Sequence, residues 1–459
     1  MAFPMYQSVS NPIFREYEPA GPSLVNERSL RLSYIFLWLF TVSIYARPED
    51  IFPFLAPLHL TFILGLCSGL TYVGALLSGN ARLRWSWELR IVLLLTVWYA
   101  VGVPFSLWKS GSLEVLTQVW LKTVLIFFLL TQTLVTIQRV HALLWAIILS
   151  ELVVTSYSIF QSSRVIWVGE RMSGVNLGIL GWNFLGIAAA ISIPYIAALF
   201  VSQRSIWSTG LLAAASLSML WMLVLTASRG GLLNVLLSAG LTVLLVLRGK
   251  SRGRLVGIWI IAALFLAVSM APQVFWQRLG TVWDNSGSSM NAVQESAEES
   301  TQDRMAVLDR SIQYTLEHPG FGLGLGNFQV ASGLQLGQPS AWMGTHNTFT
   351  QISSEAGVPA LLLFLALLFT AVCNMWRVSR AAVDAEANLM ARATLASLLS
   401  FVFGAVFAHL AYEYYLFYPV ANAVGIYAIV AAPSQVNLAE SDPAVKAGTQ
   451  AAGEILCWK

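Results

Sequence analysis

Long apolar runs recur along the chain and decide what it can fold into. A helix rises about 1.5 Å per residue, so about 20 mostly apolar residues are needed to cross a bilayer. The run 206–247 is about twice that length and must break at Ser228-Arg229-Gly230-Gly231, where two glycines and a charge interrupt it. We expect about twelve spans, at roughly 31–46, 57–78, 89–107, 113–137, 140–160, 178–202, 206–226, 229–247, 255–270, 358–376, 391–411 and 415–432.

The composition agrees with an all-α integral membrane protein. Hydrophobic residues make up 57% of the chain and charged residues only 11%, whereas soluble domains carry about 25% charged residues. A net charge of +3, without a basic patch, does not indicate a nucleic-acid partner. The three cysteines are widely spaced and predict neither a disulfide framework nor a metal site.

The distribution of basic residues predicts the orientation. Arg and Lys concentrate in the loops that face the cytoplasm if the N-terminus is cytoplasmic, as positive-inside topology requires. Both termini are then cytoplasmic. The expected organisation is a tail at 1–30, nine spans at 31–270, a long periplasmic loop at 271–357, three spans at 358–432 and a tail at 433–459.

Three arginines on the expected outer side need an explanation. Arg229 begins a helix that Ser228 can cap, and the free N–H groups and dipole of such an end attract anions. An arginine there adds a bidentate grip on phosphate. A topological anchor explains Arg229 equally well. Arg171 and Arg304, each taken alone, are more often surface charges than ligands.

The long loop falls into three parts. Residues 284–303 are rich in Ser and acidic residues and are expected to be flexible. Residues 304–320 have apolar residues at helical spacing. The stretch "HPGFGLGLGNF" that follows (318–328) includes Gly324 and Gly326, and its glycines allow the backbone to approach another chain or a ligand closely. It lacks the Lys-Ser/Thr of a phosphate-binding P-loop.

A polar strip, "GTHNTFTQISSEAGVPALL" (344–362), leads directly into the tenth span. If it begins a helix, His346, Thr350 and Ser353 share one face, and Asn347 and Glu355 lie on the neighbouring face. Polar groups at a membrane border are costly unless paired or functional. His346 therefore has the best local case for chemistry. The other histidines, including His409, are expected to be interfacial or structural.

Together these pieces resemble the O-antigen ligase and polymerase superfamily. The resemblance rests on "ASRGG" (227–231), an arginine ahead of "HPGFGLGLGNF", then "HNTFTQISSEAGVPALL", and it extends to "RMSGVNLGILGWNFLGIAAA" (171–190). The resemblance covers about 171–362 and agrees with the twelve-span layout. Only the hydropathy of the first 160 residues, and none of their motifs, contributes to it.

The resemblance implies a glycosyltransferase of the GT-C type that takes a glycan from undecaprenyl diphosphate. Its acceptor would be lipid A–core or a growing polysaccharide, on the outer side of the bacterial inner membrane. His346 would be the catalytic histidine, Arg229 and Arg304 would hold the diphosphate, and Arg171 is a weaker candidate. Asn347, Glu355, Gly324 and Gly326 are the expected substrate-binding residues. No outer Asp-x-Asp is present, so we expect direct, inverting displacement without a metal or other cofactor.

Three activities stay open at this point. Ligase and polymerase share the chemistry and differ in the acceptor. The stretch "HLAYEYYLFYP" (409–419) could stack sugars, although an aromatic interfacial belt is its commoner meaning. A transporter or flippase would place polar groups near the bilayer midplane, where Lys122 and Glu151 are the main charges. Because the polar residues gather at the outer side, we rank transport below transfer.

Overall fold

The computed structural model describes residues 28–160, 165–168, 171–175, 182–203, 205–226, 228–247, 292–337, 343–381 and 383–431, with isolated positions between 257 and 276. Most of these residues form helices. The helices are α1 (Arg31–Ala46), α2 (Pro48–Ile51), α3 (Leu60–Leu77), α4 (Trp87–Gly102), α5 (Lys109–Glu114), α6 (Leu121–Thr133), α7 (Ile137–Phe160), α8 (Trp182–Ser202), α9 (Ile206–Thr226), α10 (Arg229–Leu241), α13 (Ala292–Glu317), α14 (Phe328–Gln335), α15 (Thr348–Arg380), α16 (Ala385–Gly404) and α17 (Phe417–Ala431). Short 3₁₀ or π turns join or extend several of them.

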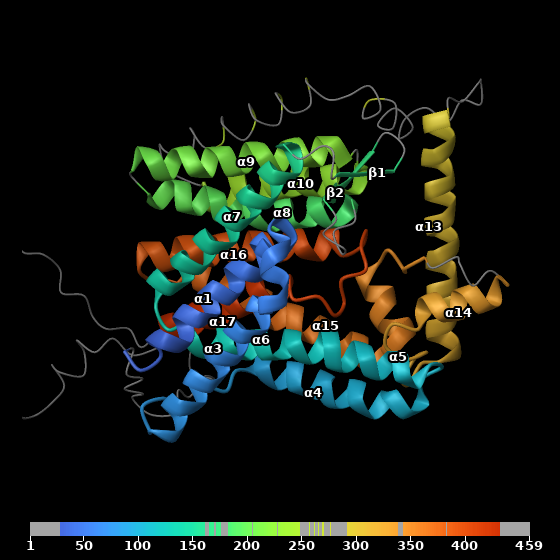
Figure 1. Cartoon of the computed structure of the whole chain (residues 1–459), viewed down its shortest axis with the longest axis horizontal. Coiled ribbons are helices and arrows are strands. Elements are labelled where there is room, and N and C mark those ends of the chain that lie inside the picture. Colours follow the sequence, from blue (N-terminus) through green and yellow to red (C-terminus); the bar gives the residue numbers. More distant parts are fainter. Residues whose placement is uncertain are drawn as a thin grey trace, which may run out of the picture.

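The long helices form a bundle in which most axes run roughly side by side (Figure 1). Within the described residues, 8 helices are long and apolar enough to cross a membrane, and three shorter apolar helices accompany them. Each expected span except 255–270 overlaps one of these helices. That exception lies almost wholly outside the described residues. The chain is therefore a helical, multi-pass membrane protein.

One short antiparallel sheet departs from a purely helical fold. Strands β1 (Val165–Val168) and β2 (Arg171–Val175) pair with each other, and Val168 lies opposite Arg171 in their register. Valine, isoleucine and tryptophan supply the β propensity of the first strand. The hairpin joins α7 to α8 at the end of the bundle where α13 lies (Figure 1).

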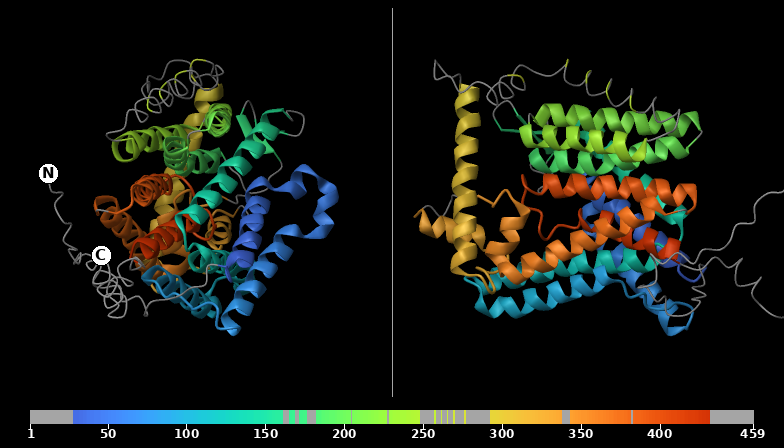
Figure 2. Two further views of the ribbon diagram at one scale, coloured as in Figure 1. Left: turned by 90° about the vertical axis from the view of Figure 1, so that its left-hand side faces the viewer. Right: turned by 180° about the vertical axis from the view of Figure 1, so that it is seen from behind.

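Helix α13 crosses the end of the bundle at a steep angle to the other helices (Figures 1 and 2). It begins at Ala292, so the expectation of a flexible stretch over 284–303 is wrong from that residue onward. Residues 284–291 lie outside the described part of the chain. Residues 292–303 form a helix because Ala, Glu and Gln are strong helix formers even without an apolar period. The predicted helix over 304–320 is its second half.

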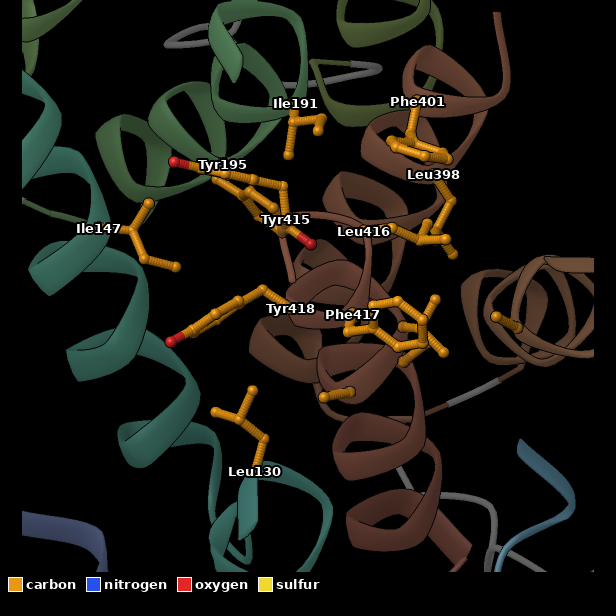
Figure 3. Close-up of a cluster of buried hydrophobic side chains, with 14 of the residues drawn as sticks. Leu130, Ile147, Ile191, Tyr195, Leu398, Phe401, Tyr415, Leu416, Phe417 and Tyr418 are labelled. Carbon is orange, nitrogen blue, oxygen red and sulfur yellow. The ribbon is translucent and has the colours of Figure 1, made fainter. Parts of the chain in front are cut away.

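The packed core lies where α17 meets the surrounding helices (Figure 3). Phe417 and Tyr418 are almost completely buried there, among side chains of α6, α7, α8 and α16. Tyr418 also shares a hydrogen bond with Thr41 of α1, at 3.0 Å. This packing fixes α16 and α17, and therefore both ends of the loop between them, residues 405–416.

Helices α8 and α10 cross at glycines. The α-carbon of Gly231 lies 2.4 Å from where a Cβ on Gly186 would sit, so a side chain at 186 would collide with the α10 backbone. The sequence break before α10 is confirmed, because α9 ends at Thr226 and α10 begins at Arg229. Ser228 caps α10 as expected, accepting a hydrogen bond from the Gly231 amide at 3.1 Å. This close crossing fixes the position of the Arg229 backbone.

Candidate functional site

His346 lies just ahead of α15 and not within it. Its backbone is left-handed, with φ of 49°, and the helix starts at Thr348. The expectation that His346, Thr350 and Ser353 share one helical face is therefore wrong. The reason is Asn347, whose side-chain oxygen accepts hydrogen bonds from the amides of Phe349 and Thr350 at 2.9 and 3.1 Å. Asn347 is the N-cap, and the chain turns sharply immediately before it.

Asn347 therefore has a structural role, because its side-chain oxygen caps the start of α15. Its expected contact with substrate stays a prediction. The half-buried imidazole of His346 projects from the turn that this cap creates.

Helix α15 is broken at Gly357, where φ is 83° and ψ is 173°. Pro359 follows and has no N–H to donate to the Glu355 carbonyl. The glycine loop, residues 318–328, occupies the break. Amides of Leu323 and Gly324 donate to the carbonyls of Ser354 and Glu355, both at 2.8 Å. The loop therefore satisfies backbone groups that the broken helix leaves unpaired.

The glycines of this loop serve close packing against the protein. Gly324 and Gly326 have φ of 100° and 71°. A Cβ on Gly324 would lie 2.3 Å from the Ser106 side chain, and one on Gly326 would lie 2.9 Å from that of Val115. The predicted close approach is present, but its partners are α15 and the segment around α5. The expected role of both glycines in binding substrate stays a prediction.

Glu355 joins the same network. Its buried carboxylate accepts hydrogen bonds from the Gly326 amide at 2.9 Å, the Phe328 amide at 3.3 Å and the Tyr412 hydroxyl at 2.7 Å. These contacts hold the glycine loop and the α16–α17 loop against α15. Glu355 therefore positions these two loops, and its expected direct contact with substrate stays a prediction.

The α16–α17 loop is tied to the start of α15. The Thr348 amide donates to the Ala405 carbonyl at 2.8 Å, and its hydroxyl donates to the Ala408 carbonyl at 2.7 Å. The side-chain oxygen of Gln351 accepts from the Ala411 amide at 3.1 Å. These bonds place the intervening residue, His409, beside His346.

The two histidine rings meet edge to face. Their centroids are 5.4 Å apart and their planes are inclined by 73°. Gly344 makes room for this contact, because a Cβ there would lie 2.7 Å from the His409 ring. Residues 63 positions apart are thus brought into one site. His409 was expected to be interfacial or structural, and the sequence signal that could have found it is the aromatic stretch 409–419 that it begins.

Two arginines approach the histidine pair. Arg229 and Arg304 are half-buried, and they are close enough for the charge of Arg229 to act on Arg304. Burial, and then the charge of Arg229, lower the pKa of the Arg304 guanidinium. Arg304 in turn acts on His346. We call Arg229, Arg304, His346 and His409 the basic cluster.

The basic cluster disfavours protonated histidine. Burial, followed by the charges of His409 and Arg304, lowers the pKa of His346 from its usual 6.5 to about 4. The His409 side chain is open to solvent on one side, but protein surrounds it elsewhere, and this desolvation lowers its pKa too. His346 is therefore neutral near pH 7 and able to accept a proton.

Within this cluster the cations act on one another: Arg229 acts on Arg304, and Arg304 and His409 act on His346. Among the described residues, neither of the two ion pairs involves Arg304 or His346. Within that same part of the chain, no group of three His, Cys, Asp or Glu side chains could hold a metal ion. Concentrated positive charge at low exposure costs free energy, and a bound anion would repay it.

The predicted site residues thus divide into two groups. The structure brings Arg229, Arg304 and His346 together, whereas Asn347, Glu355, Gly324 and Gly326 build the backbone around them. Arg171 lies in β2, which contacts α8 and α9. Its side chain is outside the described part of the structure, so its expected role stays a prediction.

Comparison with known proteins gives one finding. Residues 214–365 match the family model described as O-Antigen ligase. This match includes Arg229, Arg304 and His346, and it supports the resemblance to the O-antigen ligase and polymerase superfamily that the sequence motifs indicate. No curated protein is similar enough to the chain to count as a match.

Proposed function

We propose that this chain, whose residues 214–365 carry the O-antigen ligase domain, transfers a glycan from undecaprenyl diphosphate to lipid A–core or a similar acceptor. The observation that carries the proposal is the basic cluster. A diphosphate is the group whose charge complements two arginines beside a neutral histidine. The same arrangement suits a leaving diphosphate, on which negative charge grows during transfer.

The proposed reaction is a direct, inverting displacement without a metal ion. An acceptor hydroxyl attacks the anomeric carbon, the bond from that carbon to the diphosphate oxygen breaks, and the hydroxyl proton moves to His346. Arg229, Arg304 and the amides at the start of α10 stabilise the departing diphosphate. No other cofactor is invoked, because the diphosphate is already a good leaving group.

The bound diphosphate also improves the base in this scheme. Burial, with the charges of His409 and Arg304, keeps the pKa of His346 low. Two negative charges beside these cations would raise that pKa toward neutral pH. His346 would thus become a stronger base only when the donor is present, and acceptor activation would follow donor binding.

The finer architecture is part of the proposal. We propose twelve spans in a GT-C-type arrangement in the bacterial inner membrane, with both termini cytoplasmic and the basic cluster on the periplasmic side. The positive-inside distribution of Arg and Lys supports this orientation. Helix α13, which contains Arg304, crosses the end of the bundle (Figure 2). It would then lie over the periplasmic surface of the inner membrane.

A polysaccharide polymerase is the second candidate, because it would use the same donor chemistry with a lipid-linked acceptor. A transporter or flippase is a more distant one. Of the two charges expected within spans, Glu151 accepts a hydrogen bond from Ser192 at 2.8 Å, and the described residues that line its pocket include none of the basic cluster.

The test is to replace His346 or Arg229 with alanine in the host cell and to separate surface glycan on a gel. We expect surface glycan to be lost in both variants at normal protein level. Accumulated long lipid-linked chains would identify a ligase, and accumulated single repeat units would identify a polymerase. Normal glycan in both variants would overturn the assignment.

A further inference from the structure

His409 has a placement that a structural or interfacial histidine does not need. Its ring meets the ring of His346 edge to face at 5.4 Å. It packs over the bare backbone of Gly344, where even a methyl group would collide with it. The loop that carries it is fastened on both sides, through Thr348 and Gln351.

The fastening links the two histidines mechanically. Thr348 lies two residues after His346 and bonds both to Ala408 and to Leu410, the residues on either side of His409. The turn that presents His346 and the loop that presents His409 therefore share one anchor. A displacement of either histidine would break hydrogen bonds that hold the other.

We infer that His409 is a positioning residue of the proposed site, which fixes the orientation of the His346 ring and adds a further basic group beside the diphosphate. This inference rests on the proposed function. The His409 side chain is exposed to solvent, whereas that of His346 is half-buried. Arg304 of α13 and Arg229 of α10 complete the basic surroundings.

An electrostatic consequence makes the inference testable without transfer activity. His409 is one of the groups that lower the pKa of His346. Removal of its imidazole would raise that pKa, so His346 would become protonated at a higher pH. The His346 ring would also lose its edge-to-face contact with His409, and the access of small reagents to His346 would change.

Diethyl pyrocarbonate reacts with neutral imidazole, and modification of each of the 5 histidines can be followed by peptide mass spectrometry. The full-length protein in nanodiscs is compared with His409→Gln, and with His318→Gln as a control at an exposed histidine. In the native protein we expect His346 to react at pH 5 nearly as fast as at pH 7. In His409→Gln, where the pKa of His346 should be higher, the ratio of the pH 5 rate to the pH 7 rate should fall about twofold.

Inorganic pyrophosphate separates this inference from the proposed function. It should slow His346 modification in the native protein and in His318→Gln, and slow it less in His409→Gln. An unchanged His346 rate, pH ratio and pyrophosphate protection in His409→Gln would overturn the positioning role. Failure of pyrophosphate to protect His346 in the native protein would instead count against the diphosphate site, whatever His409 does.

Discussion

Replacement of Arg304 by alanine is expected to lower the rate of glycan transfer by about 100-fold or more, which is the usual cost of removing one group that stabilises transition-state charge. Arg304 is half-buried and acts electrostatically on His346. Its loss would remove one grip on the leaving diphosphate. Arg304→Lys should recover only part of the rate, because lysine keeps the charge but lacks the planar fork of donors.

Arg310 provides the matched control on the same helix. Its guanidinium bonds the Ser332 hydroxyl of α14 at 2.8 Å and lies on a different face of α13 from Arg304. Arg310→Ala should leave the rate near that of the native protein. The measurement is the initial rate of transfer of labelled glycan in isolated membranes, normalised to protein level. A native transfer rate in Arg304→Ala, or an equal loss of rate in Arg304→Ala and Arg310→Ala, would show that Arg304 does not belong to the site.

Replacement of Gly357 by alanine is expected to have the largest effect on folding. A Cβ there would lie 1.8 Å from the Gly320 carbonyl oxygen. Its φ of 83° with ψ of 173° is also a region that non-glycine residues enter at a cost of about 1–3 kcal/mol. We expect the glycine loop to separate from α15, with a lower melting temperature and a lower yield of monodisperse protein in detergent.

Gly240 in α10 supplies the contrast. A Cβ at that position meets nothing within 4 Å, and its backbone is helical. Gly240→Ala should raise stability slightly, by up to about 1 kcal/mol, because alanine is the better helix former. Intrinsic fluorescence during heating and size-exclusion chromatography report both variants. Equal melting temperatures for Gly357→Ala and the native protein would show that the loop does not depend on the break.

Local rules predicted much of the fold. Apolar length located the described spans, and the break before Arg229 and its Ser228 cap followed from residue type. Two expectations failed where two local preferences competed. Helix propensity overrode the acidic, serine-rich character of 292–303, and Asn347 capped the helix after His346 where continuous periodicity had been assumed.

The site was less predictable than the spans. Arg229 and His346 stand out because charged or titratable groups at a membrane border require a reason, whereas the family resemblance was needed to select Arg304. The roles of Glu355 and the loop glycines depend on what packs against them, which the sequence does not state. His409 is the clearest case, because hydrogen bonds of Thr348 and Gln351 bring its loop to His346, and no local sequence pattern announces them.

If the basic cluster binds the diphosphate of a lipid-linked donor, undecaprenyl diphosphate should bind to the purified protein in nanodiscs. Calorimetry can compare the native chain with an Arg229→Ala/Arg304→Ala double variant. We expect saturable binding to the native protein and its loss in the double variant, while Arg310→Ala binds normally. Equal binding by the native protein and the double variant would contradict this expectation.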